Sequence, residues 1–130
     1  MAYRDANGAP IAGTPFGDDA AAGATAAAGA LAPALPAQAG KTNVLTGILV
    51  TGSGATGTSI IVITVTGLVG GTMSIEYVVP AGATLVGPTV FLDFGRGIPA
   101  SGPNVAITLN VPSMGAGNTN AAAHIRGFAI

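Results

Sequence analysis

Glycine and proline interrupt this chain so often that a long helix has little room to form. The 130 residues include 21 Gly and 9 Pro. Gly loses much backbone entropy when it is ordered in a helix, and Pro lacks the backbone donor that a helix needs. The β-branched residues gather in the second half of the chain, which favours strands there. We therefore expect one domain of short strands joined by turns.

Six segments after residue 40 have the length and pattern of strands. Residues 72–79 are the clearest case, because large apolar residues alternate there with Thr72, Ser74 and Glu76. Residues 58–66 contain the run Ile-Ile-Val-Ile, which is apolar on both parities and predicts that both faces of the strand are covered. Such strands predict a single antiparallel β-sandwich, and a jelly roll is one arrangement that fits. The six segments are residues 44–51, 58–66, 72–79, 89–94, 104–111 and 121–130, with a possible seventh before residue 41 or at 84–86.

The composition changes sharply near residue 40. Residues 1–40 are rich in Ala, Gly and Pro and have no helical stripe of large apolar side chains. The run 20–28 could form a short helix capped by Asp18 or Asp19. We expect residues 1–40 to be an extended N-terminal arm with at most this helix, and residues 41–130 to be the β-sandwich domain.

Ionic groups are scarce in this chain. Only 7% of the residues are charged, 49% are hydrophobic, and the formal net charge is −1. The four cations are scattered and form no basic stripe for phosphates, so we expect no binding to nucleic acid or to a membrane surface. A free monomer of this size usually carries more charge, which indicates that other subunits cover much of its surface. The cations are Arg4, Lys41, Arg96 and Arg126.

Neither a membrane span nor a disulfide framework is expected. The uncharged stretch 20–40 is mostly Ala and is broken by Pro33 and Pro36, so it would make a poor spanning helix. Residues 1–8 are polar and lack the apolar region of a signal peptide. The absence of Cys excludes disulfides and Cys-based metal sites, and oligomerisation is one common alternative source of stability.

No catalytic constellation is recognisable. His124 is the only histidine, and Asp93 is the acid that could pair with it as a general base. We interpret His124 instead as a polar side chain on a strand, and a subunit contact would suit it. Glu76 and Asp93 lie on the polar faces of their strands, where a cross-strand pair with Arg96 or Arg126 is the better interpretation. We predict no enzyme activity, no catalytic residue, no metal site and no cofactor.

Three other features also have simple structural interpretations. Asp18 and Asp19 could bind a cation, but no ladder of further oxygen ligands accompanies them, so a helix cap or a solvated turn is preferred. Residues 52–57 are superficially similar to a phosphate loop, yet Lys and a following helix are missing, which indicates a hairpin loop. Phe91 has the opposite parity to Phe94 and could pack between subunits, while the lack of Trp weakens carbohydrate binding.

The chain contains several turn and strand motifs, at residues 3–10, 40–47, 65–68 with 70–72, 79–82, 98–100, and 115–120 before 124–128. They resemble motifs of small structural proteins of tailed-phage particles. The resemblance covers most of the chain outside the alanine-rich arm and rests on turns and strands rather than on chemistry. It implies a virion protein, such as a decoration or cement protein on the outside of the head, bound to the major capsid protein or another virion protein.

The hypotheses differ in how the chain would be used. A cement protein would form an oligomer on the shell, with a trimer favoured, and residues 1–40 would lie along a neighbour. A chain without residues 1–40 should then fold but no longer bind particles. A tail, neck or head-fibre component would use the same sandwich at low copy number. A small surface-exposed binding module would be a monomer with its own ligand site.

Overall fold

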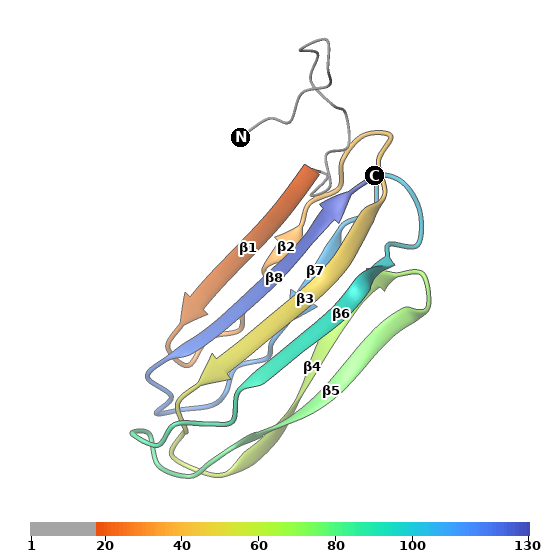
Figure 1. The fold of residues 1–130 in the computed structure, drawn as a ribbon. Helices are drawn as coiled ribbons and strands as arrows, with labels where there is room; N and C mark the ends of the chain where they lie inside the picture. Colours follow the sequence, from red (N-terminus) through yellow and green to blue (C-terminus); the bar gives the residue numbers. More distant parts are fainter. Residues whose placement is uncertain (1–17) are drawn as a thin grey trace.

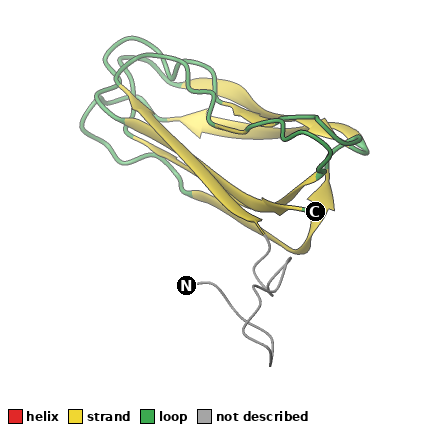
Figure 2. Ribbon diagram, turned by 90° about the horizontal axis from the view of Figure 1, so that it is seen from above, coloured by secondary structure: helices red, strands yellow, loops and turns green. Residues whose placement is uncertain are grey.

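The computed structural model describes residues 18–130, which form two antiparallel four-stranded sheets packed face to face (Figure 1). The strand order is β1-β8-β3-β6 in the first sheet and β2-β7-β4-β5 in the second. Figure 2 shows the sheets as two separate layers. The all-β sandwich predicted from the sequence is confirmed. The strands are β1 (Asp18–Ala26), β2 (Ala34–Leu35), β3 (Asn43–Gly52), β4 (Ser59–Leu68), β5 (Gly71–Val79), β6 (Val90–Pro99), β7 (Ile107–Asn110) and β8 (Ala121–Ala129).

The strands pair as they would if the chain formed one long antiparallel hairpin that then rolled up into two sheets. β4 pairs with β5, β3 with β6, β2 with β7 and β1 with β8, so the two halves of the chain run antiparallel to each other. Two further pairings, β3 with β8 and β4 with β7, join the halves into two sheets. Two four-stranded sheets connected in this way form a jelly roll. Residues 1–8, for which the sequence predicts no signal peptide, lie outside the described residues.

The core between the sheets comes from the inward-facing residues of each alternating strand. β8 shows the pattern well, because Ala123 and Ile125 are buried while His124 and Arg126 are exposed. Removing these apolar side chains from water stabilises the fold by roughly 25 cal/mol per Å² of buried area. Among the fully buried side chains are Leu35, Leu45, Ile48, Val50, Ile63, Val65, Ile107 and Leu109.

β1 replaces the short helix that the alanine-rich run allowed. Each residue from Asp18 to Ala26 pairs with a residue of β8. This pairing, and the packing of alternate small side chains on the core, outweigh the modest helix preference of Ala. β2 also precedes residue 41, and its Leu35 is fully buried. The first described strand of the sandwich therefore begins at Asp18, inside the segment that the sequence assigned to the arm.

Asn43 fastens the end of the sandwich at which β3 begins. Its side chain is 1% exposed, and its Nδ2 donates to the carbonyl oxygens of Leu35, Pro36 and Val105 at 3.3, 2.9 and 2.9 Å. These carbonyls belong to β2 and to the segments that follow β2 and precede β7. One side chain thus holds three backbone segments together.

Asn118 has the corresponding role at the opposite end. It is 3% exposed, and its Oδ1 accepts from the backbone N of Ala28 at 3.2 Å. Its Nδ2 donates to the carbonyls of Ser53 and Asn120 at 2.7 and 3.1 Å. The loops after β1, after β3 and before β8 are therefore joined through one amide group.

Residues 52–57 cross from one sheet to the other, so the prediction of a hairpin loop was wrong. The strands on either side, β3 and β4, lie in different sheets. The crossing loop is held by backbone bonds from Gly54 N to Leu85 O at 2.7 Å and from Ala55 N to Pro80 O at 3.0 Å. A Gly-rich turn marks a change of direction, but its residues do not specify which sheet the next strand joins.

Tyr77 places a phenol at the edge of the core. The side chain is buried, and its hydroxyl donates to the carbonyl of Pro88 at 2.6 Å. Burial raises the pKa of Tyr77 above its usual value of 10.0, because the phenolate would lose its hydration.

The free energy of unfolding of the wild type should fall as the pH rises through about 10, relative to that of Tyr77→Phe. Above this pH the tyrosine of the unfolded chain ionises, whereas the folded protein keeps it protonated, so ionisation favours unfolding. At neutral pH the variant should be less stable by about 1 kcal/mol, because the bond to Pro88 is lost. Urea unfolding of both proteins between about pH 7 and about pH 11 measures this. A difference between them that stays constant over that range would contradict the prediction.

Candidate functional site

The structure does not bring His124 and Asp93 together. His124 lies opposite Leu49 of β3, whereas Asp93 lies on β6 opposite Gly47, and β3 separates β6 from β8. Asp93 instead meets Arg126, with 3.8 Å between Oδ2 and Nη2, so the cross-strand pair expected from the sequence is confirmed for this acid. No group of three or more His, Asp and Glu residues in the described part of the chain could hold a metal ion.

Asp18 and Asp19 do not cap a helix. They begin β1, where their backbones pair with Ala129 and Phe128 of β8. The structure describes the backbone of these two residues but not their side chains.

The outer face of the first sheet carries two rows of residues that run across all four strands. From β6 to β1, one row is Phe91, Leu49, His124 and Gly23. His124 lies close over β1, because a Cβ at Gly23 would be only 2.5 Å from its Nδ1. The imidazole of His124 can lie over β1 only because residue 23 is a glycine.

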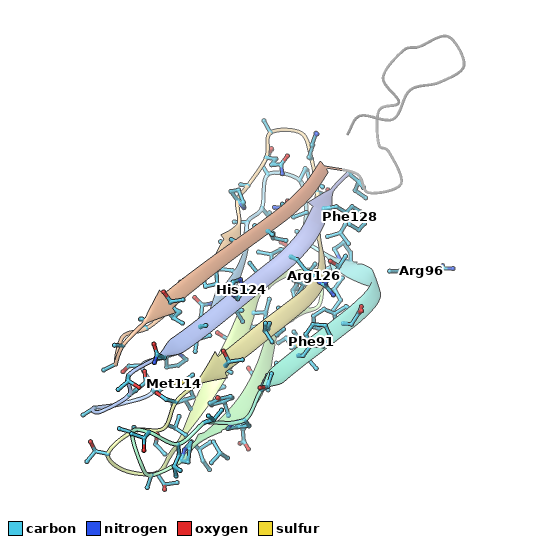
Figure 3. The ribbon with its side chains drawn as sticks, turned by 60° about the vertical axis from the view of Figure 1, so that its left-hand side comes forward. Phe91, Arg96, Met114, His124, Arg126 and Phe128 are labelled. Atoms are coloured by element: carbon cyan, nitrogen blue, oxygen red, sulfur yellow. The ribbon has the colours of Figure 1, made fainter. Side chains whose placement is uncertain are left out.

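The second row is Asp93, Gly47, Arg126 and Ala21, in the same strand order. Arg126 reaches across β3 toward β6, because a Cβ at Gly47 would be 2.6 Å from its Nε. Its guanidinium carbon lies 5.6 Å from the centre of the Phe91 ring, within the range of a cation–π contact. His124, Arg126 and Phe91 can be followed on the strands of this sheet in Figure 3. Both polar side chains of β8 thus lie along the face.

Between the two rows is a shallow hollow of about 230 Å³. Leu49 and Phe91 contribute apolar walls, and His124 and Arg126 contribute donors. Sites for small molecules usually measure roughly 300–1,000 Å³ and enclose most of the ligand. The hollow is therefore better suited to a side chain of a partner protein than to a free substrate.

A larger hollow of about 410 Å³ opens among the loops at the end where β8 begins. Hydroxyl groups line it, including those of Ser53 and Thr119, beside the exposed aliphatic side chain of Val86. The hydroxyl of Ser53 already accepts from the backbone N of Thr119 and Asn120, both at 3.1 Å. These hydroxyls mainly hold the loops together.

The outer face of the second sheet exposes aliphatic side chains. Ile60 is 66% exposed and lies opposite Val78, which is also exposed; Val62, opposite Glu76, is exposed as well. The prediction that both faces of β4 are covered is therefore wrong for a single chain, because no element of the described residues packs on this face. Contiguous exposed apolar side chains of this kind mark surfaces that bind other proteins.

Sequence reasoning identified Phe91, His124 and Arg126 but missed Gly23 and Gly47. These two glycines leave room for the side chains of His124 and Arg126, because a Cβ atom at either position would collide with them. A signal was available, because a glycine inside a strand often marks a place where another group approaches the backbone closely.

Comparisons with known proteins identify no relative of this chain. No protein-family model matches it, and no match is found among curated proteins or solved structures. Within residues 18–130 there is no helix with the length and hydrophobicity to cross a membrane.

Proposed function

We propose that this protein is a structural subunit of a bacteriophage particle, bound to the outside of the head shell as a decoration or cement protein. The observation that carries this proposal is the exposure of large apolar side chains on both outer faces of the sandwich. Ile60 is 66% exposed on the second sheet, and Phe91 is 58% exposed on the first. Free monomers rarely leave contiguous apolar surface uncovered, and the scarcity of charge in this chain makes such surface more prone to associate.

The partners in this proposal are the major capsid protein or another virion protein, and further copies of the same chain, with a trimer favoured. Apolar area that leaves water at these contacts would contribute roughly 25 cal/mol per Å², less the cost of association. Within the arm predicted over residues 1–40, β1 and β2 take part in the sandwich, and residues 1–17 lie outside the described residues. The motif resemblance to phage structural proteins supports the same role. A jelly roll alone does not, because one fold serves many functions.

The copy number of this protein in purified particles tests the proposal. We expect a fixed ratio to the major capsid protein that corresponds to hundreds of copies, measured by quantitative mass spectrometry. We also expect particles stripped of the protein to lose their DNA at a lower temperature and to recover when it is added back. A few copies per particle would indicate a tail, neck or head-fibre component instead. Absence from the particle would leave the small binding module as the alternative.

A further inference from the structure

The two sides of the sandwich are closed by different kinds of side chain. At one side lie β1 and β2, and at the other lie β5 and β6 (Figure 1). The inward-facing residues of β1 that pack on the core are small, namely Ala20, Ala22, Ala24 and Ala26. In β5 and β6 four large inward-facing side chains are only partly buried, while Tyr77 and Val79 of β5 are fully buried. The four are Met73, Ile75, Leu92 and Phe94. We call these four residues and the two strands that carry them the β5–β6 side.

The partial burial of Met73 and Ile75 contrasts with the full burial of their partners in β4. In the neighbouring strand β4, the inward-facing Ile63 and Val65 are fully buried. Met73 and Ile75 pair with Val65 and Ile63 across the β4–β5 ladder, yet they remain partly exposed. The β5–β6 side therefore leaves part of the core in contact with water, and another protein layer could cover it.

β5 also has a backbone edge that is open to pairing. It is nine residues long, and its pairing with β4 is regular from Val79 to Met73. Edge strands are usually protected by charged side chains, Pro or a bulge. Between Met73 and Val79 the pairing has no bulge and the sequence no Lys or Pro, and Glu76 is the one charged residue. The other long edge on this side, β6, is interrupted by Gly95 and Gly97, whose φ angles are 60° and 94°. β5 is thus the edge that a further strand could extend.

The charges on the β5–β6 side are of opposite sign. Glu76 is exposed on β5, and Arg96 is exposed on β6, where Figure 3 shows it directed away from the strands. Neither has an ion-pair partner among the described residues, whereas Asp93 and Arg126 pair with each other. One side of the chain thus presents an acid and a base that have no ion-pair partner within residues 18–130.

We propose that the β5–β6 side is the contact between copies of this chain, with Glu76 of one copy against Arg96 of the next. A second copy is the occupant that the charges favour, because it necessarily supplies the complementary base and acid from the same surface. The contact would also cover Met73, Ile75, Leu92 and Phe94 and give the edge of β5 a neighbour. This inference rests on the oligomeric state in the proposed function and identifies the surface that produces it.

Charge reversal in the full-length chain tests this contact. Glu76→Arg and Arg96→Glu should each raise the dissociation constant of the oligomer about tenfold or more, since attraction becomes like-charge repulsion. The double variant Glu76→Arg/Arg96→Glu should restore association, because the pair is rebuilt with its signs exchanged. Sedimentation equilibrium over a range of protein concentrations measures all three. Lys41→Glu, which makes the same charge change as Arg96→Glu at another position, should leave the dissociation constant unchanged.

Two results would overturn the inference. One is a wild type that stays monomeric at every concentration, and the other is single variants that associate as tightly as the wild type. If a reversal prevents folding, as judged by circular dichroism, Glu76→Gln and Arg96→Gln should weaken association in the same direction but less. Particle binding is measured separately. A monomeric protein that binds phage heads would refute this contact alone, and an oligomer absent from particles would refute the proposed function alone.

Discussion

A chain that begins at Asp18 should unfold as cooperatively as the full-length protein, whereas a chain that begins at Lys41 should not form the sandwich. The first truncation removes none of the described residues. The second removes β1 and β2, which are an edge strand of the first sheet and the partner of β7 in the second. The expectation from sequence was that a chain without residues 1–40 would remain folded, and the pairing of β1 and β2 in the sheets leads us to predict the opposite.

The losses in the shorter chain are both apolar and polar. Leu31 and Leu35 are buried, and each contributes about 1.5–3 kcal/mol by leaving water. Val111 loses two backbone bonds of 2.8 Å to Leu31, and Asn43 loses the acceptors at Leu35 and Pro36. Together with the β1–β8 ladder, these losses match or exceed the 5–15 kcal/mol by which domains are usually stable.

Thermal unfolding followed by circular dichroism distinguishes the two truncations. The chain from Asp18 should keep the midpoint of the full-length protein within a few degrees, and it serves as the control for the loss of residues 1–17. The chain from Lys41 should be insoluble or show no cooperative transition. A cooperative transition at an unchanged midpoint in the shorter chain would show that β1 and β2 are dispensable.

Asn118→Ala should lower the free energy of unfolding by about 2–4 kcal/mol. The substitution leaves the backbone N of Ala28 and the carbonyl of Ser53 without the amide that now joins them at 3.2 and 2.7 Å. These groups belong to separate loops, so the loss also loosens the end of the sandwich. Urea unfolding at neutral pH measures the change.

Two further variants make this prediction specific. Asn120→Ala is the matched control, because this side chain is exposed on the same loop, and its free energy should change by less than about 0.5 kcal/mol. Asn118→Asp keeps an acceptor for Ala28 but replaces the donor that faces the carbonyls of Ser53 and Asn120 with oxygen, so it should destabilise at least as strongly. Equal stabilities of the Asn118→Ala and Asn120→Ala variants would argue against a structural role for this amide.

Most strands after residue 40 could be predicted because their residues alternate between large apolar and polar side chains, and residues 58–66 because they form a run of β-branched residues. Residues 72–79 show this alternation and correspond to β5. β1 could not be predicted in this way, since both of its faces carry small residues and Ala by itself favours helix. Only the pairing with β8, a tertiary contact, makes residues 18–26 a strand. β2 is two residues long, too short for any periodicity to appear.

The candidate surfaces were predicted in part. Alternation along the strand placed Phe91 and Asp93 on the outward face, where an arginine was expected to pair with Asp93. The exposure of Phe91 and the contact between Asp93 and Arg126 confirm both predictions. The glycines opposite His124 and Arg126 lie on other strands, so their effect depends on the register between strands. Single-strand patterns carry no information on register, and for this reason they could not reveal the two rows across the first sheet.

The pairing of β1 with β8 has a consequence for biosynthesis. Asp18 pairs with Ala129, so β1 finds its partner only after β8, the last described strand, has been made. Until β8 has left the ribosome, β1 has no ladder to join, and the sandwich of the nascent chain stays incomplete. Contacts between such distant parts of a sequence also slow folding once translation ends. Incomplete sandwiches with unpaired strand edges are prone to associate with one another before folding is complete.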